Sequence, residues 1–147
     1  MGLKAKDIMD PHVLTVDVGT DAQSCAKMLV GHHQRCALLG TDTLPIRGIV
    51  TEWDIIEKVV ALGRDPASVR VEEIASFPVE TCPVDMPTDE VVARMVEREI
   101  RRMVVIHGDR VVGVITARCV MSSFRKYIDQ LSAEIAGYQS SNMPTGN

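Results

Sequence analysis

Apolar and polar residues along the chain follow two periodicities, and these occur in the same order twice. Segments with apolar residues at every second position are typical of half-buried strands. Segments with apolar residues at three- and four-residue steps indicate amphipathic helices. Each copy has an alternating segment, a helical one, and then two short apolar ones. The predicted strands are residues 13–16, 36–39 and 46–50 in the first copy, and 79–82, 103–106 and 111–115 in the second.

Capping signals predict where the first helix of each copy begins. Thr20-Asp21-Ala22-Gln23 is a capping-box pattern, in which the Thr oxygen and the Gln side chain satisfy unpaired backbone N–H groups. The second copy has Thr88 followed by two acids, which favour the positive end of a helix dipole. We expect one face of this second helix to be buried, namely Val91, Val92, Met95 and Val96.

A glycine, two branched aliphatic residues and a threonine mark where the last strand of each copy passes into a second helix. In the first copy this junction runs from Gly48 to Asp54, and the helix is predicted over 52–62. In the second copy it runs from Gly113 to Cys119. The two junctions differ in one respect, because Cys119 stands where Asp54 stands. The second junction shows that a helix can start at this point without an acid. The fold therefore does not require Asp54 in the first junction, and we interpret Asp54 as a ligand-binding residue.

Each copy is thus a β-α-β-β-α unit of about 60 residues, a size that buries too little surface to be stable alone. The sequence predicts an α+β fold in which two such units pack face to face with approximate two-fold symmetry. We divide the chain into repeat 1 (residues 1–66), repeat 2 with the last helix (67–138), and a tail (139–147). Ser, Asn, Pro and Gly dominate the tail, which predicts disorder.

The last helix is predicted to be longer than its counterpart in the first copy. Its apolar residues recur at three- and four-residue steps and form an amphipathic stripe. This stripe either folds back on the two repeats or joins a second chain. Its members are Val120, Met121, Phe124, Ile128, Leu131, Ile135 and Tyr138.

Composition narrows the class of protein. Hydrophobic residues make up 46% of the 147 residues, yet no apolar run approaches the roughly 18 residues of a membrane span. The N-terminus has no secretory pattern, so a cytoplasmic location is expected. The net charge of −4 and an aromatic content of 3% argue against a nucleic-acid surface. The four cysteines, of which none form a CxxC pair, predict buried thiols and no metal site.

The order of elements, the two copies and the heptapeptide Gly48 to Asp54 resemble a tandem CBS domain, named for cystathionine β-synthase. The resemblance covers about Lys4 to Tyr127. It implies a CBS pair, or Bateman module, a regulatory unit that binds an adenosine-containing ligand between the repeats. AMP, ADP, ATP and S-adenosylmethionine are the ligands it suggests. It also implies a homodimer packed through the second helices of the repeats, which acts on a partner protein that the sequence does not name.

The resemblance assigns roles to residues of a first cleft. It implies that Asp54 accepts the ribose hydroxyls and that Thr51 contacts ribose or phosphate. The adenine pocket is expected along residues 75–81 of the partner repeat, which include Ala75, Val79 and Thr81, with Val79 as its main wall. The phosphate of the ligand is expected to contact Arg102, together with Arg101. These roles agree with chemistry, since a carboxylate suits a vicinal diol and a guanidinium suits phosphate.

The matching residues of a second cleft are Met9, Val13, Arg35, Thr116 and Cys119. A thiol cannot accept two ribose hydroxyls as a carboxylate does. The resemblance therefore supports a ligand in the second cleft less well than in the first.

Other interpretations of these residues remain open. Thr51 and Asp54 also fit a capping box, and Arg101 could simply complement a helix dipole. A ligand-free assembly module that regulates a partner is the main alternative function, and a nucleic-acid regulator is a weaker one. We found no nucleophile elbow, phosphate loop or converging pair of acids, so the chain is interpreted as a protein that is not an enzyme.

Overall fold

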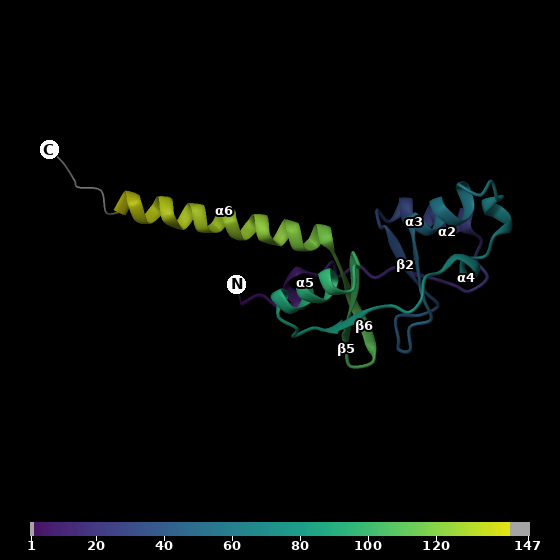
Figure 1. Ribbon diagram of the computed structural model, residues 1–147, viewed down its shortest axis with the longest axis horizontal. Coiled ribbons are helices and arrows are strands. Elements are labelled where there is room, and N and C mark those ends of the chain that lie inside the picture. Colours follow the sequence, from purple (N-terminus) through teal and green to yellow (C-terminus); the bar gives the residue numbers. More distant parts are fainter. Residues whose placement is uncertain (1, 142–147) are drawn as a thin grey trace.

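The computed structural model describes residues 2–141, with side chains described through Tyr138. It contains two three-stranded sheets of the same topology (Figure 1). In the first, β2 (Cys36–Leu39) pairs in parallel with β1 (Thr15–Val16) and antiparallel with β3 (Ile49–Thr51). In the second, β5 (Arg102–His107) stands between β4 (Thr81–Pro83) and β6 (Arg110–Thr116) in the same way. The predicted α+β pair of repeats is confirmed.

The longer helices lie where the apolar periodicity predicted them. Helix α2 (Ala22–Gly31) follows β1 and α5 (Thr88–Glu97) follows β4. After β3 the chain forms α3 (Glu52–Ile55), which continues as the π-helical segment η1 (Ile56–Val60). Helix α6 (Ala117–Ser141) follows β6 directly. The remaining helical segments are short, namely α1 (Ala5–Ile8), η2 (Pro66–Ser68) and α4 (Val71–Ile74).

Three local predictions were wrong. The N-cap of α2 is Asp21, whose carboxylate accepts from the backbone N–H of Ser24, while Thr20 lies one residue too early. Val96 was expected in the core, but it lies 73% exposed on the outer side of α5, whereas Val91 and Met95 are buried. Strand β3 begins at Ile49 instead of residue 46. The loop before it pairs with the other repeat, where the Leu44 N–H donates to the carbonyl of Asp109 (2.7 Å).

The two cores exchange their short helices. Val71 and Ile74 of α4 pack in the core of the first repeat with α2 and β2. Ala5 and Ile8 of α1 pack in the core of the second repeat. Packing therefore does not follow the division of the sequence at residue 66, because each half takes its first short helix from the other repeat.

A third apolar cluster joins the two sheets. Leu38 and Ile49 of the first sheet pack there against Val104, Val111 and Val114 of the second. Two isolated bridges extend the contact, Ile49 with Ser76 and Val114 with Asp10, and they occupy equivalent positions in the two repeats. The repeats are thus packed against each other with the approximate two-fold relation that the sequence predicted.

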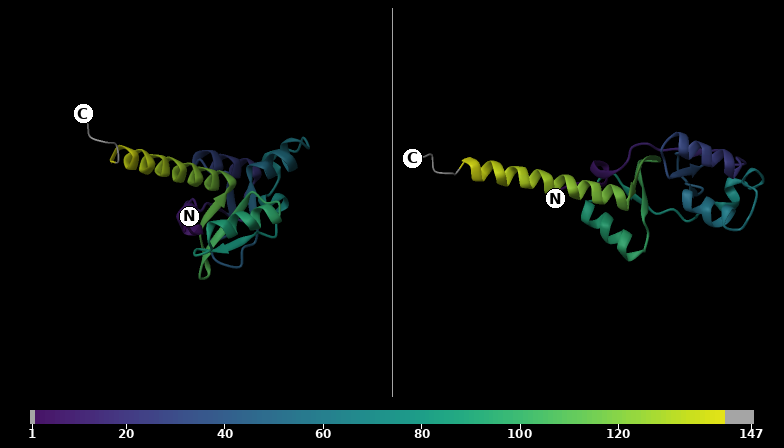
Figure 2. Two further views of the ribbon diagram at one scale, coloured as in Figure 1. Left: turned by 60° about the vertical axis from the view of Figure 1, so that its left-hand side comes forward. Right: turned by 90° about the horizontal axis from the view of Figure 1, so that it is seen from above.

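Helix α6 extends away from the two sheets and does not fold back on them (Figures 1 and 2). Only its first residues join a core, where Cys119 and Val120 pack against the second repeat. The helix continues through Ser141, past Gln139, where we expected the tail to begin. The predicted disorder of residues 142–147 lies outside the described residues. None of the described helices is both long enough and apolar enough to cross a membrane.

Candidate ligand cleft between the repeats

The strand-to-helix junction of the first repeat is closed by a capping box. The backbone N–H of Asp54 donates to Oγ1 of Thr51 (3.1 Å), and Oδ2 of Asp54 accepts from the backbone N–H of Thr51 (2.8 Å). The hydroxyl of Thr51 also donates to Oδ2 (2.9 Å). The capping interpretation of these two residues is therefore confirmed.

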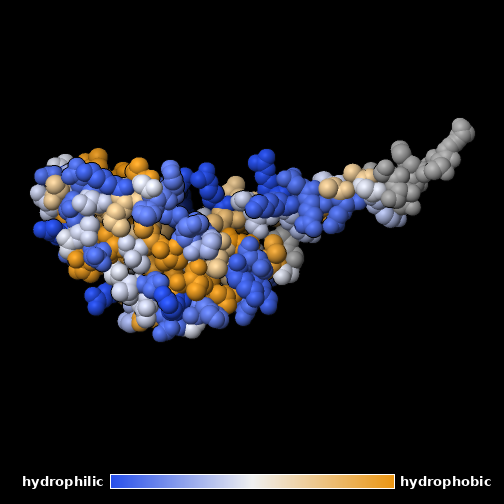
Figure 3. All heavy atoms as spheres, turned by 180° about the vertical axis from the view of Figure 1, so that it is seen from behind, coloured by the Kyte–Doolittle hydropathy of each residue, from blue (hydrophilic) through white to orange (hydrophobic). Residues whose placement is uncertain are grey.

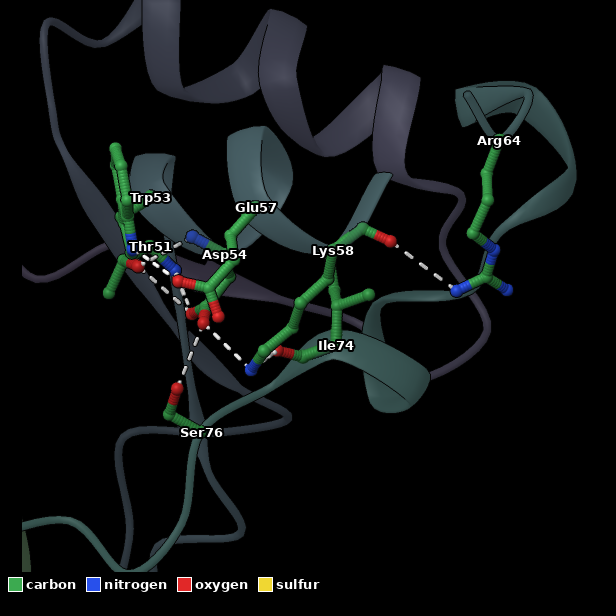
Figure 4. Close-up of polar contacts among 8 residues, drawn as sticks. All are labelled: Thr51, Trp53, Asp54, Glu57, Lys58, Arg64, Ile74 and Ser76. Carbon is green, nitrogen blue, oxygen red and sulfur yellow. Dashed lines mark hydrogen bonds and ion pairs between the residues drawn. The ribbon is translucent and has the colours of Figure 1, made fainter. Parts of the chain in front are cut away.

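The other oxygen of Asp54 is also occupied (Figure 4). Oδ1 accepts from Nζ of Lys58 and from the hydroxyl of Ser76, both at 2.9 Å. Lys58 in turn donates to the carbonyl oxygen of Ile74 (2.9 Å), so it connects η1 to α4. A carboxylate offers about four lone-pair positions, and four donors fill them here. The Asp54 side chain is 6% exposed, and these donors are what make its burial tolerable.

These contacts correct the argument drawn from Cys119. Thr116 caps the corresponding helix without an acid, as the backbone N–H of Cys119 donates to its Oγ1 (3.2 Å). The fold can therefore start a helix without an acid, as expected. Asp54 nevertheless has a structural role of its own, because it holds Lys58 and Ser76 as well as the helix start. The presence of Asp54 in the junction therefore does not by itself imply a bound ligand.

Four of the predicted ligand-binding residues line a common cleft, which we call the Arg102 cleft. They are Thr51, Val79, Arg101 and Arg102. The cleft has a volume of about 220 Å³. Its full lining is Ile49, Thr51, Ser76, Pro78, Val79, Glu80, Ile100, Arg101, Arg102 and Val104. Both repeats contribute, so the cleft lies between them as predicted.

The other three predicted residues lie outside the lining. Asp54 lies behind Thr51 and Ser76, to which it is hydrogen-bonded. Ala75 packs against the core of the first repeat. Thr81 pairs with Val104 within the second sheet.

Arg102 is the most distinctive residue of the cleft. It is half-buried at the start of β5, and its Nε atom is buried without a hydrogen-bond partner in the described part of the chain. A buried donor that lacks a partner carries a desolvation cost of about 1–3 kcal/mol, more when the group is charged. The carboxylate of Glu80 in the same lining is paired with Arg98, so it does not neutralise Arg102. The cleft therefore combines apolar walls with an arginine whose Nε has no hydrogen-bond partner among the described residues.

Sequence reasoning missed Lys58 and Ile100. It included Ser76 and Pro78 in the predicted segment 75–81 but did not predict that Ser76 contacts Asp54. Lys58 follows Asp54 by four residues in the same helical segment, and this i,i+4 spacing of opposite charges indicates an ion pair. Ser76 has no such signal, because only the bridge between Ile49 and Ser76 brings it to Asp54. The apolar walls follow from the packing of the two sheets.

The residues predicted for the second cleft do not converge on one cavity. Met9 and Cys119 line a cavity of about 340 Å³ at the base of α6. Val13 lines a separate one of about 180 Å³. Arg35 lies beside α2 and α3, where it pairs with Glu52 (3.6 Å). Thr116 lines none of these three cavities.

Strand register explains why the second cleft has no counterpart of Arg102. Arg102 pairs with Thr116 across β5 and β6, and Cys36 pairs with Thr51 across β2 and β3. The equivalent of Arg102 in the first repeat is therefore Cys36, and Arg35 is equivalent to Arg101. The second cleft lacks both the acid of the junction and the arginine at the strand entry.

All four cysteines are free thiols, as expected. Burial raises the pKa of the thiols of Cys25, Cys36 and Cys82 above the ordinary value. The positive charge of Arg102 acts in the opposite direction on Cys36 but is the smaller effect. Within the described residues, no three His, Cys, Asp or Glu side chains come together in an arrangement that could hold a metal ion.

The fold defines a pair of repeats that pack against each other with a cleft between them, and a family comparison names the class. The model of the CBS domain matches residues 5–61 and again 71–126, so the chain belongs to the CBS domain family. A CBS pair is a regulatory ligand-binding module.

One curated relative is similar to part of the chain. The uncharacterized protein MK0525 of Methanopyrus kandleri is 31% identical over 93 residues, which are 63% of this chain and 47% of that protein. The chain thus spans about half the length of this relative.

Two solved structures are similar over most of the chain. The hexameric CBS-CP12 protein from bloom-forming cyanobacteria has a TM-score of 0.77 and 28% identity, covering 97% of this chain and 90% of that one. The CBS domain pair of protein MJ0100 was solved in complex with 5-methylthioadenosine and S-adenosyl-L-methionine. It has a TM-score of 0.74 and 26% identity, covering 86% of this chain and 99% of that one.

Proposed function

We propose that this CBS pair is a regulatory sensor that binds an adenosine-containing ligand in the Arg102 cleft. The observation that carries the proposal is the buried Nε of Arg102, which lacks a partner in the described residues. A phosphate or carboxylate of the ligand would pair with this guanidinium, whose planar set of N–H groups suits both anions. Because Nε is buried, the Arg102 side chain would shift for Nε to take part. Arg101 stands beside it at the mouth of the cleft.

The apolar lining suits a purine base. Ile49, Pro78, Val79, Ile100 and Val104 offer aliphatic walls. Burial of a base against them contributes about 25 cal/mol per Å² of apolar area. The cavity of about 220 Å³ is smaller than the roughly 300–1,000 Å³ of typical ligand pockets. We therefore propose that part of the nucleotide stays in solvent or that the repeats move apart on binding.

The ribose would bind at Thr51 and Ser76, with Asp54 behind them. Asp54 has no vacant lone pair, so a ribose hydroxyl reaches it only by replacing a present donor. We propose that the hydroxyl of Ser76 is the donor replaced, because Ser76 lines the cleft while Lys58 lies outside its lining. Asp54 thus has a structural role in the free protein and accepts a ribose hydroxyl in the complex.

The complex of protein MJ0100 supports an adenosyl ligand for the present chain. The module would act by favouring one arrangement of the repeats, which requires a different ligand affinity for the two arrangements. A partner protein or a second copy of the chain would respond to that change. We propose that the chain itself is not an enzyme.

A ligand-free assembly module is the second candidate function. The saturation of Asp54 by its own chain favours it, since a scaffold needs no vacant acceptor. The hexameric assembly of the similar CBS-CP12 protein is consistent with this candidate as well.

A thermal-shift panel with AMP, ADP, ATP, S-adenosylmethionine and NADH separates the two candidates. A bound ligand stabilises the folded state by RT ln(1 + [L]/Kd), about 2.7 kcal/mol at a hundred times Kd. We expect one adenosyl compound to raise the melting temperature of the wild type, and a smaller shift for Asp54→Ala. Glu73→Ala is the matched control, because Glu73 is also a capping acid but lies at the start of α4.

Two results would contradict the proposal as stated. One is a panel in which no compound shifts the wild type. The other is an equal ligand-induced shift in Asp54→Ala and Glu73→Ala. The first would favour the assembly module, and the second would remove Asp54 from the site.

A further inference from the structure

Helix α6 carries an apolar seam that the described part of the chain leaves exposed. Met121, Phe124, Ile128, Leu131 and Ile135 follow one another at alternating steps of three and four residues. Their side chains are between 39% and 71% exposed. Tyr138 continues the same spacing. This is the a and d pattern of a coiled coil, sustained over about two and a half heptads.

The helix is placed where this seam can meet another molecule. Its 25 residues correspond to a length of about 37 Å, most of which extends beyond the sheets (Figures 1 and 2). A lone helix in water gains little stability from its backbone alone. From behind, α6 presents mainly hydrophilic residues (Figure 3), so its apolar residues are concentrated on another face. An exposed seam on a projecting helix is a contact surface.

The identity of the seam residues indicates which partner fits. Isoleucine at the a positions 128 and 135 with leucine at the d position 131 favours two parallel strands. In that register the g and e positions that face each other are 120 with 125 and 127 with 132. These pairs are Val with Arg and Tyr with Ser, so no like charges oppose one another. The seam is therefore complementary to itself.

We propose that α6 binds α6 of a second copy of this chain as a parallel two-stranded coiled coil. The seam runs without interruption into an apolar cavity at the base of the helix. This cavity has a volume of about 720 Å³, and Leu3, Val92, Val120 and Phe124 are among its lining residues. The parallel orientation brings the two CBS pairs to the same end of the coil. It also brings these two cavities next to each other.

The mass of the full chain in solution tests this proposal, measured by analytical ultracentrifugation over a range of concentrations. We expect a dimer whose dissociation constant rises by about a hundredfold in Ile128→Glu, because a charge is placed in the seam. Ala133→Glu is the matched control, since residue 133 lies on the opposite side of the same helix and the same charge is added. We expect it to leave the dissociation constant within about twofold of the wild type.

Cross-linking determines the orientation. Under mild oxidation, Ile135→Cys should form a disulfide-linked dimer, because equal positions face each other in a parallel coil. In an antiparallel coil of the same seam, residue 135 would lie opposite residue 124, and Ile135→Cys would not cross-link. The wild type, with its four native thiols, gives the background.

Four outcomes would overturn the proposal, and the first three concern the three measurements in turn. These three are a monomer at all concentrations, a dissociation constant equally affected in Ile128→Glu and Ala133→Glu, and an Ile135→Cys protein without a cross-link above the background. A dimer that persists unchanged in Ile128→Glu would place the contact elsewhere and would also overturn it. None of these outcomes depends on ligand binding in the Arg102 cleft.

Discussion

At the scale of single residues, two charged side chains differ in how their polar atoms are paired. Asp54 has a donor for each of its lone pairs, whereas Nε of Arg102 has no acceptor in the described residues. A satisfied buried charge stabilises its surroundings, and an unsatisfied one is a cost that a ligand can remove. This contrast makes Arg102, and not Asp54, the stronger sign of a binding site.

The internal contacts of Asp54 give a stability prediction that needs no ligand. Asp54→Ala removes the acceptor of Lys58, Ser76 and Thr51, and leaves the Lys58 ammonium beside the Ile74 carbonyl alone. We expect a loss of about 2–4 kcal/mol in the free energy of unfolding, measured by urea denaturation. Glu73→Ala removes an exposed capping acid and should cost only about 1 kcal/mol. Equal losses in the two variants would show that the contacts of Asp54 contribute nothing beyond a cap.

The sequence predicts contacts between residues that are close along the chain, but not contacts between residues that only the fold brings together. Thr51, Asp54 and the arginines lie in short segments whose elements are clear from periodicity and from the junction pattern. Ser76 reaches Asp54 only through the folded chain, 22 positions away in the sequence. Likewise, only strand register identifies Cys36 as the counterpart of Arg102, since the sequence offers Arg35 as the nearer match.

At the scale of elements, the two repeats have the same strand order and register but exchange their first short helices. Periodicity predicted the strands and longer helices because each of them buries one face locally. It could not predict that α1 packs with the second repeat and α4 with the first, because a four-residue segment has the same pattern in either core. The exposure of Val96 has the same origin, as the spacing cannot say how wide the buried face of a helix is.

The bridge between Asp10 and Val114 provides a prediction at this scale. A Cβ atom at Gly113 would overlap Sδ of Met9 and lie 2.9 Å from the carbonyl oxygen of Asp10. The Met9 side chain can move, but the Asp10 backbone is held by two hydrogen bonds to Val114 (2.9 Å each). Gly113→Ala should therefore lower the free energy of unfolding by about 1–3 kcal/mol.

Gly31→Ala is the control for this substitution. Gly31 is the last residue of α2, and no atom lies within 4 Å of an added Cβ. We expect no loss of stability there in the same denaturation experiment, since alanine favours a helix more than glycine does. A Gly113→Ala protein as stable as Gly31→Ala would mean that the N-terminal segment is not held against β6 as described.

At the scale of the whole molecule, the two repeats enclose a cleft to which each contributes what the other lacks. The first repeat supplies Thr51, with Asp54 hydrogen-bonded behind it, and the second supplies Arg101 and Arg102. The opposite side has Cys36 and Cys119 at the corresponding positions, so the pair is symmetric in fold and asymmetric in chemistry. The account therefore predicts one ligand for each chain, bound in the Arg102 cleft.

Calorimetric titration of AMP and adenosine tests this claim most directly, with the wild type, Arg102→Met and Arg35→Met compared. The account predicts that the wild type binds AMP more tightly than adenosine, with one site per chain. It predicts that Arg102→Met loses this preference, at a cost of about 1.5–3 kcal/mol for the charged hydrogen bond. Arg35→Met, which changes the exposed arginine of the other repeat, should keep the preference. Equal affinity of the wild type for AMP and adenosine, or an Arg102→Met protein that still prefers AMP, would contradict the account.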